Sequence, residues 1–145
     1  MKNKIGFERI KELAQDLECG FKLYINTDSL ETKTILSSYD SFGLEDNIWD
    51  DEMKQIEDNW KNYEIIEPPS SRDGFEIMES FLQKVSDPDI ERDLSMALRL
   101  KSPFANFKAI VESSKARVDW FKHKSESYIE YLTRQLEWID IEVEE

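Results

Sequence analysis

The chain has 145 residues, of which 39% are hydrophobic and 12% aromatic, and this is enough apolar surface to build a packed core. Wholesale disorder is therefore excluded, although 35% of the residues are charged. The net charge of −13 excludes a general affinity for nucleic acid unless the basic residues are clustered.

The first residues are amphipathic and broken by charge, unlike the continuous apolar stretch of a signal peptide. No apolar run reaches the roughly 18 residues of a membrane span. The single cysteine, Cys19, cannot form an intrachain disulfide. We therefore expect a soluble cytoplasmic protein without membrane contact, with Cys19 buried and reduced.

The N-terminal part predicts a helix followed by a hairpin. Apolar residues from Ile5 to Leu17 recur at helical spacing, and Cys19–Gly20 is typical of a helix end. The sequence "FKLYIN" alternates as a half-buried strand does, and "ETKTIL" is a β-branched return strand. Asp28 and Ser29 supply the turn, and a polar loop is expected from Ser37 to Gly43.

An acidic helix is expected next, because Trp49, Met53, Ile56 and Trp60 fall at i, i+4, i+7 and i+11. Its other faces carry Asp and Glu, which indicates a solvated surface. The residues "YEII" predict a short third strand before the break at Pro68–Pro69.

The rest of the chain predicts helices. Asp87 and Ser102 are each followed by proline, so each is expected to cap a helix that begins with Pro88 or Pro103. A long last helix is expected from Arg117 toward Glu142. The predicted fold class is α+β, mostly helical, as one domain over residues 1–145. Residues 1–66 would hold the helix, hairpin, acidic helix and short strand, and residues 67–145 a helical body ending in the long helix.

The last helix is predicted to have three faces. At about 100° per residue, a broad apolar stripe forms the core face, made of Val118, Phe121, Tyr128, Ile129, Leu132, Leu136 and Ile139. Trp120, Tyr131 and Trp138 share a second azimuth, flanked by basic residues, and acidic residues lie farther round. The candidate contact surface is Arg117, Trp120, Lys124, Tyr131 and Trp138.

Two interpretations of this second face stay open. Its aromatic side chains can cover an edge of the core, which is what large aromatic residues usually do. They can also be exposed anchors for a protein partner or for single-stranded nucleic acid.

The segment from Arg99 to Lys124 is the most basic part of the chain. It holds seven basic residues against two acidic ones, Glu112 and Asp119. Clustered basic charge is what phosphate contacts require, so residues 99–124 provide the alternative hypothesis of an RNA- or DNA-associated protein.

Candidate catalytic, cofactor and metal residues do not assemble into a known pattern. His123 stands alone in the sequence, and its helical position predicts a solvated side chain. Adjacent acidic pairs such as Asp50–Asp51 do not face one another on a helix. Phosphate-binding glycine motifs do not occur. We therefore predict no catalytic residue, no cofactor and no metal.

An ordered set of motifs resembles uncharacterised protein family 0158. The set comprises "FKLYINTDSLET", "GFEIMESFLQKVSDPDIERDLSMAL", "SPFANFKAIV", "DWF" and "LEWI". The family commonly has glycine in its hairpin turn, where this chain has Ser29–Leu30. The resemblance implies the fold and a bacterial source but no substrate.

Two functional hypotheses follow. The first is a non-catalytic interaction module that binds an unknown protein or a second copy of itself. The alternative is nucleic-acid binding through residues 99–124. The dependence of binding on salt separates them, because phosphate contacts release counterions.

Overall fold

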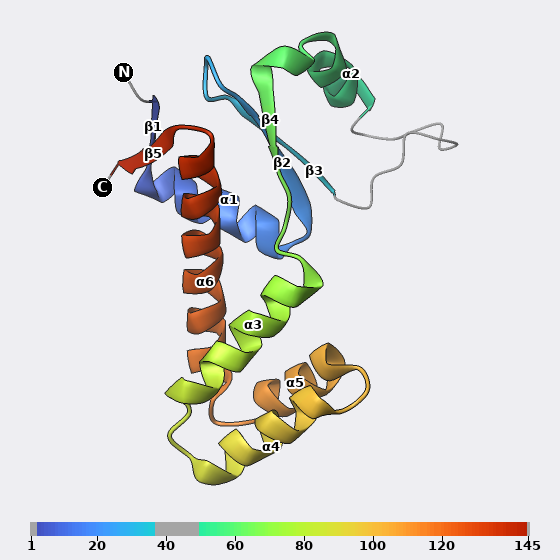
Figure 1. The fold of residues 1–145 in the computed structure, drawn as a ribbon, viewed down its shortest axis with the longest axis vertical. Coiled ribbons are helices and arrows are strands. Elements are labelled where there is room, and N and C mark those ends of the chain that lie inside the picture. Colours follow the sequence, from blue (N-terminus) through green and yellow to red (C-terminus); the bar gives the residue numbers. More distant parts are fainter. Residues whose placement is uncertain (1–2, 37–49, 145) are drawn as a thin grey trace. The chain divides into compact units, whose positions relative to one another are not determined.

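The computed structural model describes residues 3–36 and 50–144, and Figure 1 shows their helices and strands. The fold is α+β and mostly helical, with a small antiparallel sheet, as the sequence predicts. The chain forms two compact units. Unit 1 comprises Met1–Pro68 and Tyr128–Glu145, and unit 2 comprises Pro69–Ser127. One helix contributes to both units, and the single domain over residues 1–145 stays a prediction.

Two of the predicted features lie outside the described residues. They are the polar loop Ser37–Gly43 and the first part of the acidic helix, including Trp49.

The first helix of unit 1, α1 (Phe7–Glu18), has one buried face. It ends where the sequence predicts, with Cys19 as the C-cap and Gly20 at φ 90°, a conformation that glycine adopts without steric penalty. Cys19 is exposed, so its predicted burial is wrong. Cys19 follows Ile10 by nine residues, which places it about 180° from the apolar face by helical geometry. That face consists of Ile10, Leu13, Ala14 and Leu17.

The two ends of unit 1 form a parallel strand pair that the sequence did not predict. β1 (Asn3–Gly6) pairs with β5 (Ile141–Glu144), with Ile5 opposite Val143. The predictions that Ile5 belongs to the first helix and that the last helix continues to Glu142 are therefore wrong. Strands of four residues are too short to show a clear alternation. The last helix ends at Trp138, and Asp140 redirects the chain with φ 61°.

The predicted hairpin and third strand are confirmed. β2 (Phe21–Asn26), β3 (Thr32–Leu36) and β4 (Tyr63–Ile66) form an antiparallel sheet in the order β3–β2–β4. The Asn26 carboxamide oxygen organises the hairpin turn by accepting hydrogen bonds from the backbone N–H groups of Asp28 and Ser29, at 2.9 and 3.1 Å. Leu30 takes the left-handed conformation, φ 64°, in this turn.

Both faces of the central strand are covered. Leu23 and Ile25 are buried in the main core of unit 1, together with α1 and with Leu132 and Leu136 of the last helix. Tyr24 points to the other face and packs with buried residues of β3 and of α2 (Asp50–Asp58), namely Ile35 and Ile56. The two-sided packing explains why Leu23, Tyr24 and Ile25 are all buried rather than alternate ones.

The acidic helix is shorter than predicted at its C-terminal end. α2 ends at Asp58, and a 3₁₀ turn, Trp60–Asn62, leads into β4. Ile56 is buried as the helical stripe predicts, whereas Trp60 is 68% exposed. The prediction that Trp60 lies on the stripe of α2 is wrong, because the helix ends before it.

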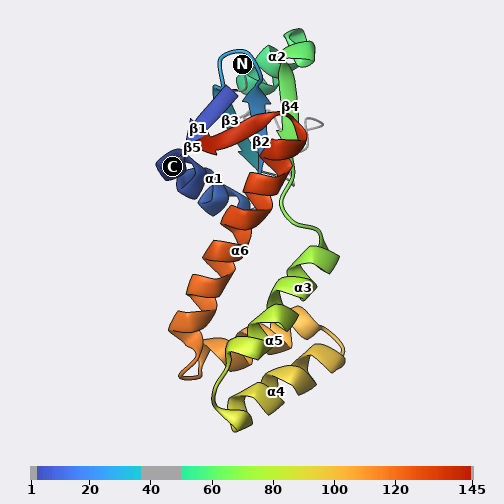
Figure 2. The ribbon, with the colours of Figure 1, turned by 60° about the vertical axis from the view of Figure 1, so that its left-hand side comes forward.

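Unit 2 contains α3 (Ser71–Phe81), α4 (Pro88–Arg99), α5 (Pro103–Glu112) and the first part of α6 (Arg117–Trp138), as shown in Figure 2. Asp87 caps α4 as predicted, accepting from the N–H groups of Asp89 and Ile90. Ser102 is at the N-cap position of α5, but it has φ 62° and its side chain makes no capping hydrogen bond.

The core of unit 2 is separate from that of unit 1. Phe81 of α3, Phe107 of α5 and Trp120 of α6 lie at its centre, each at most 6% exposed. The other buried members are Met78, Leu94, Ala97, Leu98, Val111 and Ala116. Each unit therefore buries its own set of apolar side chains, and α6 supplies residues to both sets.

Candidate interaction surface

The five predicted surface residues are divided between the two units. Arg117, Trp120 and Lys124 belong to unit 2, and Tyr131 and Trp138 belong to unit 1. All five lie on α6, but their environments differ. Arg117 is exposed and Lys124 half-buried, while the three aromatic residues range from buried to almost fully exposed.

Trp120 is a core residue of unit 2. Only 6% of it is exposed, and its ring meets those of Phe81 and Phe107 edge to face, with centroids 5.3 and 4.9 Å apart. Edge-to-face contacts at this spacing are favourable. Trp120 therefore stabilises unit 2 and does not contribute to an exposed surface.

Tyr131 is held within unit 1. Its ring is half-buried against the core, and its hydroxyl donates a hydrogen bond of 2.8 Å to the carbonyl oxygen of Glu67, just after β4. The hydroxyl thereby satisfies a backbone acceptor beside the proline break, and Tyr131 has a structural role there.

Trp138, the last residue of α6, is 86% exposed. The three predicted aromatic residues share an azimuth on the helix, but Trp120 is covered by its own unit, Tyr131 is partly covered, and Trp138 is not. An exposed indole of this size is uncommon on a surface and frequent at the centre of protein contacts.

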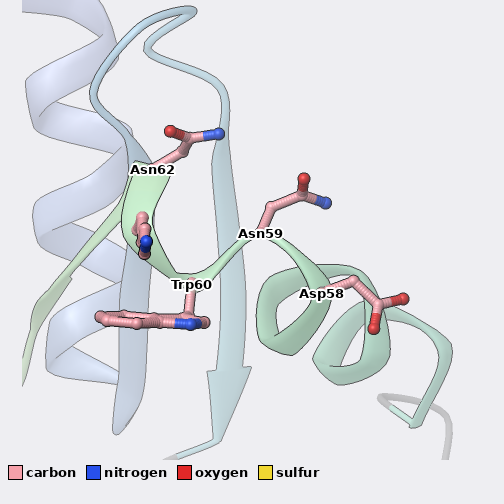
Figure 3. Close-up of a pocket in the computed structure, with 5 residues that line it drawn as sticks. Asp58, Asn59, Trp60 and Asn62 are labelled. Atoms are coloured by element: carbon pink, nitrogen blue, oxygen red, sulfur yellow. The ribbon is translucent and has the colours of Figure 1, made fainter.

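Trp60, also in unit 1, is exposed as well. It lies in the turn between α2 and β4, and Figure 3 shows its ring projecting from this turn, after Asp58 and Asn59. An open hollow of about 290 Å³ is lined by Asp58, Asn59, Trp60, Lys61 and Asn62. The Lys61 ammonium lies 5.7 Å from the centre of the Trp60 ring. The hollow has room for a side chain of a partner, since pockets for whole small molecules are usually larger.

The predicted core stripe of the last helix is correct only in unit 1. Leu132 and Leu136 are fully buried there, with Tyr128, Ile129 and Ile139 packed beside them. In unit 2, Val118 and Phe121 are 76% and 40% exposed, so their predicted burial is wrong. The prediction assumed one buried face for the whole helix. In the part of α6 that belongs to unit 2, the buried residues are Trp120 and His123 instead.

Four exposed side chains of α6 in unit 2 form what we call the α6 outer face: Arg117, Val118, Phe121 and Lys122. They span about 140° of the helix at about 100° per residue. The Arg117 guanidinium lies 5.4 Å from the centre of the Phe121 ring, a cation–π contact that holds the two side chains together. Asp119 and Glu126 fall roughly 60° and 40° beyond Lys122. The face thus combines two apolar side chains with two cations.

His123 is buried, with 7% of it exposed, so the prediction of a solvated histidine is wrong. Its ring lies 5.4 Å from that of Phe81 and 6.2 Å from that of Trp120. Burial lowers the pKa of His123, and the Lys84 ammonium lowers it further. The sequence pattern missed this burial for the same reason that it misplaced Val118 and Phe121.

Ser80 and His123 resemble a nucleophile and its base, because Ser80 Oγ lies 2.9 Å from His123 Nε2. The hydrogen bonds to the Ile77 carbonyl oxygen show that His123 does not act as a base toward Ser80. The Ser80 hydroxyl donates to it at 2.8 Å, and Nε2 faces the same oxygen at 3.1 Å. Two acceptors would repel one another, so Nε2 carries the proton and donates it. Ser80 is therefore not activated by His123, whose Nδ1 has no hydrogen-bond partner among the described residues.

The net charge is confined to one unit. Unit 2 holds ten Lys and Arg and ten Asp and Glu, and unit 1 holds nine against 22. Unit 1 therefore carries the entire charge of −13. The basic residues between Arg99 and Lys124 all lie in unit 2, where acidic residues of α3 and α4 balance them.

Within residues 3–36 and 50–144, no group of three or more His, Cys, Asp or Glu side chains is placed to hold a metal ion. None of the helices in this part of the chain is long and apolar enough to cross a membrane.

The architecture defines an α+β protein whose last helix completes two cores. The sequence from residue 5 to residue 143 matches the Uncharacterised protein family (UPF0158), and the chain belongs to this family. A relative in Pseudomonas aeruginosa, "UPF0158 protein PA5073", is 30% identical over 79 residues. That match spans 54% of this chain and 52% of the relative, about half the length of each. No solved structure matches the chain.

Proposed function

We propose that this chain is a non-catalytic, cytoplasmic protein-interaction module that binds its partner through Trp138 and Trp60 of unit 1. The observation that supports this most strongly is that Trp138 and Trp60 are 86% and 68% exposed, whereas Trp120 is only 6% exposed. Tryptophan is among the residues that contribute most binding energy in protein contacts. The exposed free thiol of Cys19 is in keeping with a reducing compartment.

The charge of unit 1 supports a partner with a basic surface. Trp60 is preceded by Glu57 and Asp58, and Trp138 by Glu137, within a unit that carries −13. Acidic residues around an aromatic anchor steer a basic partner toward it and repel acidic ones. Nucleic-acid binding through residues 99–124 has weaker support, because unit 2 carries no net charge to attract phosphate.

Site-specific photocrosslinking in cells tests this proposal. A Trp138→p-benzoylphenylalanine variant should form a covalent adduct with a defined protein. The matched control carries the same photoreactive residue at Gln83, an exposed position of unit 2. Equal adducts from both positions, or adducts with nucleic acid alone, would rule the proposal out.

A further inference from the structure

Two surfaces of the described chain complement one another in charge and in apolar character. The α6 outer face of unit 2 presents Val118 and Phe121 between the cations Arg117 and Lys122. The Trp60 corner, which we define as Glu57, Asp58, Trp60 and its hollow, presents an indole beside two carboxylates. We infer that the α6 outer face of one copy of this chain binds the Trp60 corner of a second copy. This inference rests on the proposed function, because it specifies the partner of the proposed interaction module as a second copy of the chain and names the surfaces in contact.

The α6 outer face is built for contact rather than for solvent. Val118 is 76% exposed, so the described residues leave most of its apolar surface uncovered, and the Phe121 ring is held in place by the Arg117 guanidinium. A pre-ordered aromatic side chain loses little conformational freedom when it is covered. The cations at the two edges would remain near the rim of the contact, where they select an acidic partner.

The Trp60 corner offers what this face lacks. Its hollow of about 290 Å³ is open and suits one apolar side chain such as Phe121. Glu57 and Asp58 supply carboxylates for Arg117 and Lys122. Lys61 lies over the Trp60 ring and opposes the incoming cations, so the contact depends on the two carboxylates outweighing it.

The surfaces are small, and the association should be correspondingly weak. Four side chains on one helix cover less area than a stable interface buries, so we expect a transient dimer or chain of copies that depends on concentration. Because the attraction is between exposed charges, added salt should weaken it.

Exchange of charges between two variants of the full chain tests the inference. Sedimentation velocity at low salt should show association of the unmodified chain that increases with concentration. The Arg117→Glu/Lys122→Glu variant and the Glu57→Lys/Asp58→Lys variant should each weaken association at least about tenfold. An equimolar mixture of the two variants should associate again, because the reversed charges now match. An Arg99→Glu/Lys108→Glu variant, equal in charge change but off the α6 outer face, should associate like the unmodified chain.

Several results would overturn the inference. They are a monomer at every concentration, unchanged association of the Arg117→Glu/Lys122→Glu variant, or a mixture that does not recover. Binding of a single-stranded oligonucleotide that the same variant loses would assign the face to nucleic acid instead. If position 138 still crosslinks to a different protein in that variant, the proposed function stands and only the identity of the partner as a second copy fails.

Discussion

Unit 1 and unit 2 use the same residue types for different purposes. Unit 1 carries the entire net charge of −13 and exposes Trp60 and Trp138, whereas unit 2 has no net charge and buries Trp120 with His123. In unit 2 the aromatic residues hold three helices together, and in unit 1 aliphatic residues hold the sheet against α1 and α6. The comparison shows that Trp60 and Trp138 are not part of the core of unit 1, whereas Trp120 is part of the core of unit 2.

The largest expected effect is the difference in stability lost when the buried Trp120 or the exposed Trp138 is replaced by alanine. Trp120→Ala should destabilise unit 2 by about 3–5 kcal/mol, because it leaves a cavity between Phe81 and Phe107. Trp138→Ala should change stability by no more than about 0.5 kcal/mol. Urea unfolding followed by circular dichroism measures both. Similar losses of stability in the two variants would remove the contrast between the units.

His123 should make unit 2 sensitive to acid. Its pKa in the folded chain is below the ordinary value of 6.5, so the unfolded chain binds the proton first as the pH falls. The stability that depends on neutral His123 is therefore fully present above pH 6.5. Below pH 6.5 the free energy of unfolding falls by at most about 1.4 kcal/mol per pH unit, until the pH reaches the pKa of His123 in the folded chain. Lys84 strengthens this effect, and the Ile77 carbonyl and Glu126 oppose it.

The measurement is urea unfolding between pH 7 and pH 5, followed by the fluorescence of Trp120 in a Trp49→Phe/Trp60→Phe/Trp138→Phe background. The control is His123→Gln, which keeps a donor for the Ile77 carbonyl but does not titrate. An equal slope of stability against pH in both chains would show that His123 is not the cause.

The two proline-initiated helices of unit 2 should differ at their caps. Asp87→Ala removes two side-chain hydrogen bonds from the start of α4 and should cost about 1 kcal/mol. Ser102→Ala removes no capping bond from α5 and should cost less than about 0.5 kcal/mol. Thermal unfolding of the two variants compares them directly, and a larger loss at Ser102 would contradict the capping assignment.

The smallest expected effect is that of salt on local stability. Screening of the self-repulsion among 22 acidic residues should stabilise unit 1 by a few tenths of a kcal/mol, on the order expected for exposed charges. Unit 2, with balanced charges, should respond less. Hydrogen exchange of β2 amides against α5 amides, at low and high NaCl, measures the difference. Equal protection in the two elements at both salt concentrations would contradict the prediction.

The sequence predicted those parts of the fold that leave local signals. The hairpin, the third strand and the Asp87–Pro88 helix start follow from alternation and capping chemistry, which involve neighbouring residues. The parallel pair of β1 and β5 joins the two ends of the chain, and four-residue strands carry no period from which to infer it.

The candidate surface was only partly predictable for a related reason. A helical period identifies residues that share an azimuth, as Trp120, Tyr131 and Trp138 do, but it does not tell which elements cover that azimuth. Phe81 and Phe107 cover Trp120 and lie 39 and 13 residues away from it in the sequence. The buried face of α6 in unit 2 differs from that in unit 1, which is why Val118 and Phe121 are exposed. This difference arises because α6 packs into two cores, and the packing depends on the tertiary structure.

Quenching of Trp138 fluorescence by acrylamide tests the central claim most directly. In a Trp49→Phe/Trp60→Phe variant, the remaining emission comes from Trp120 and Trp138. We predict one freely quenched and one shielded component in the free chain, with the quenched component becoming protected when the partner identified by crosslinking is added to this variant, which retains Trp138. A shielded Trp138 in the free chain, or one that is quenched equally in the complex, would contradict the account.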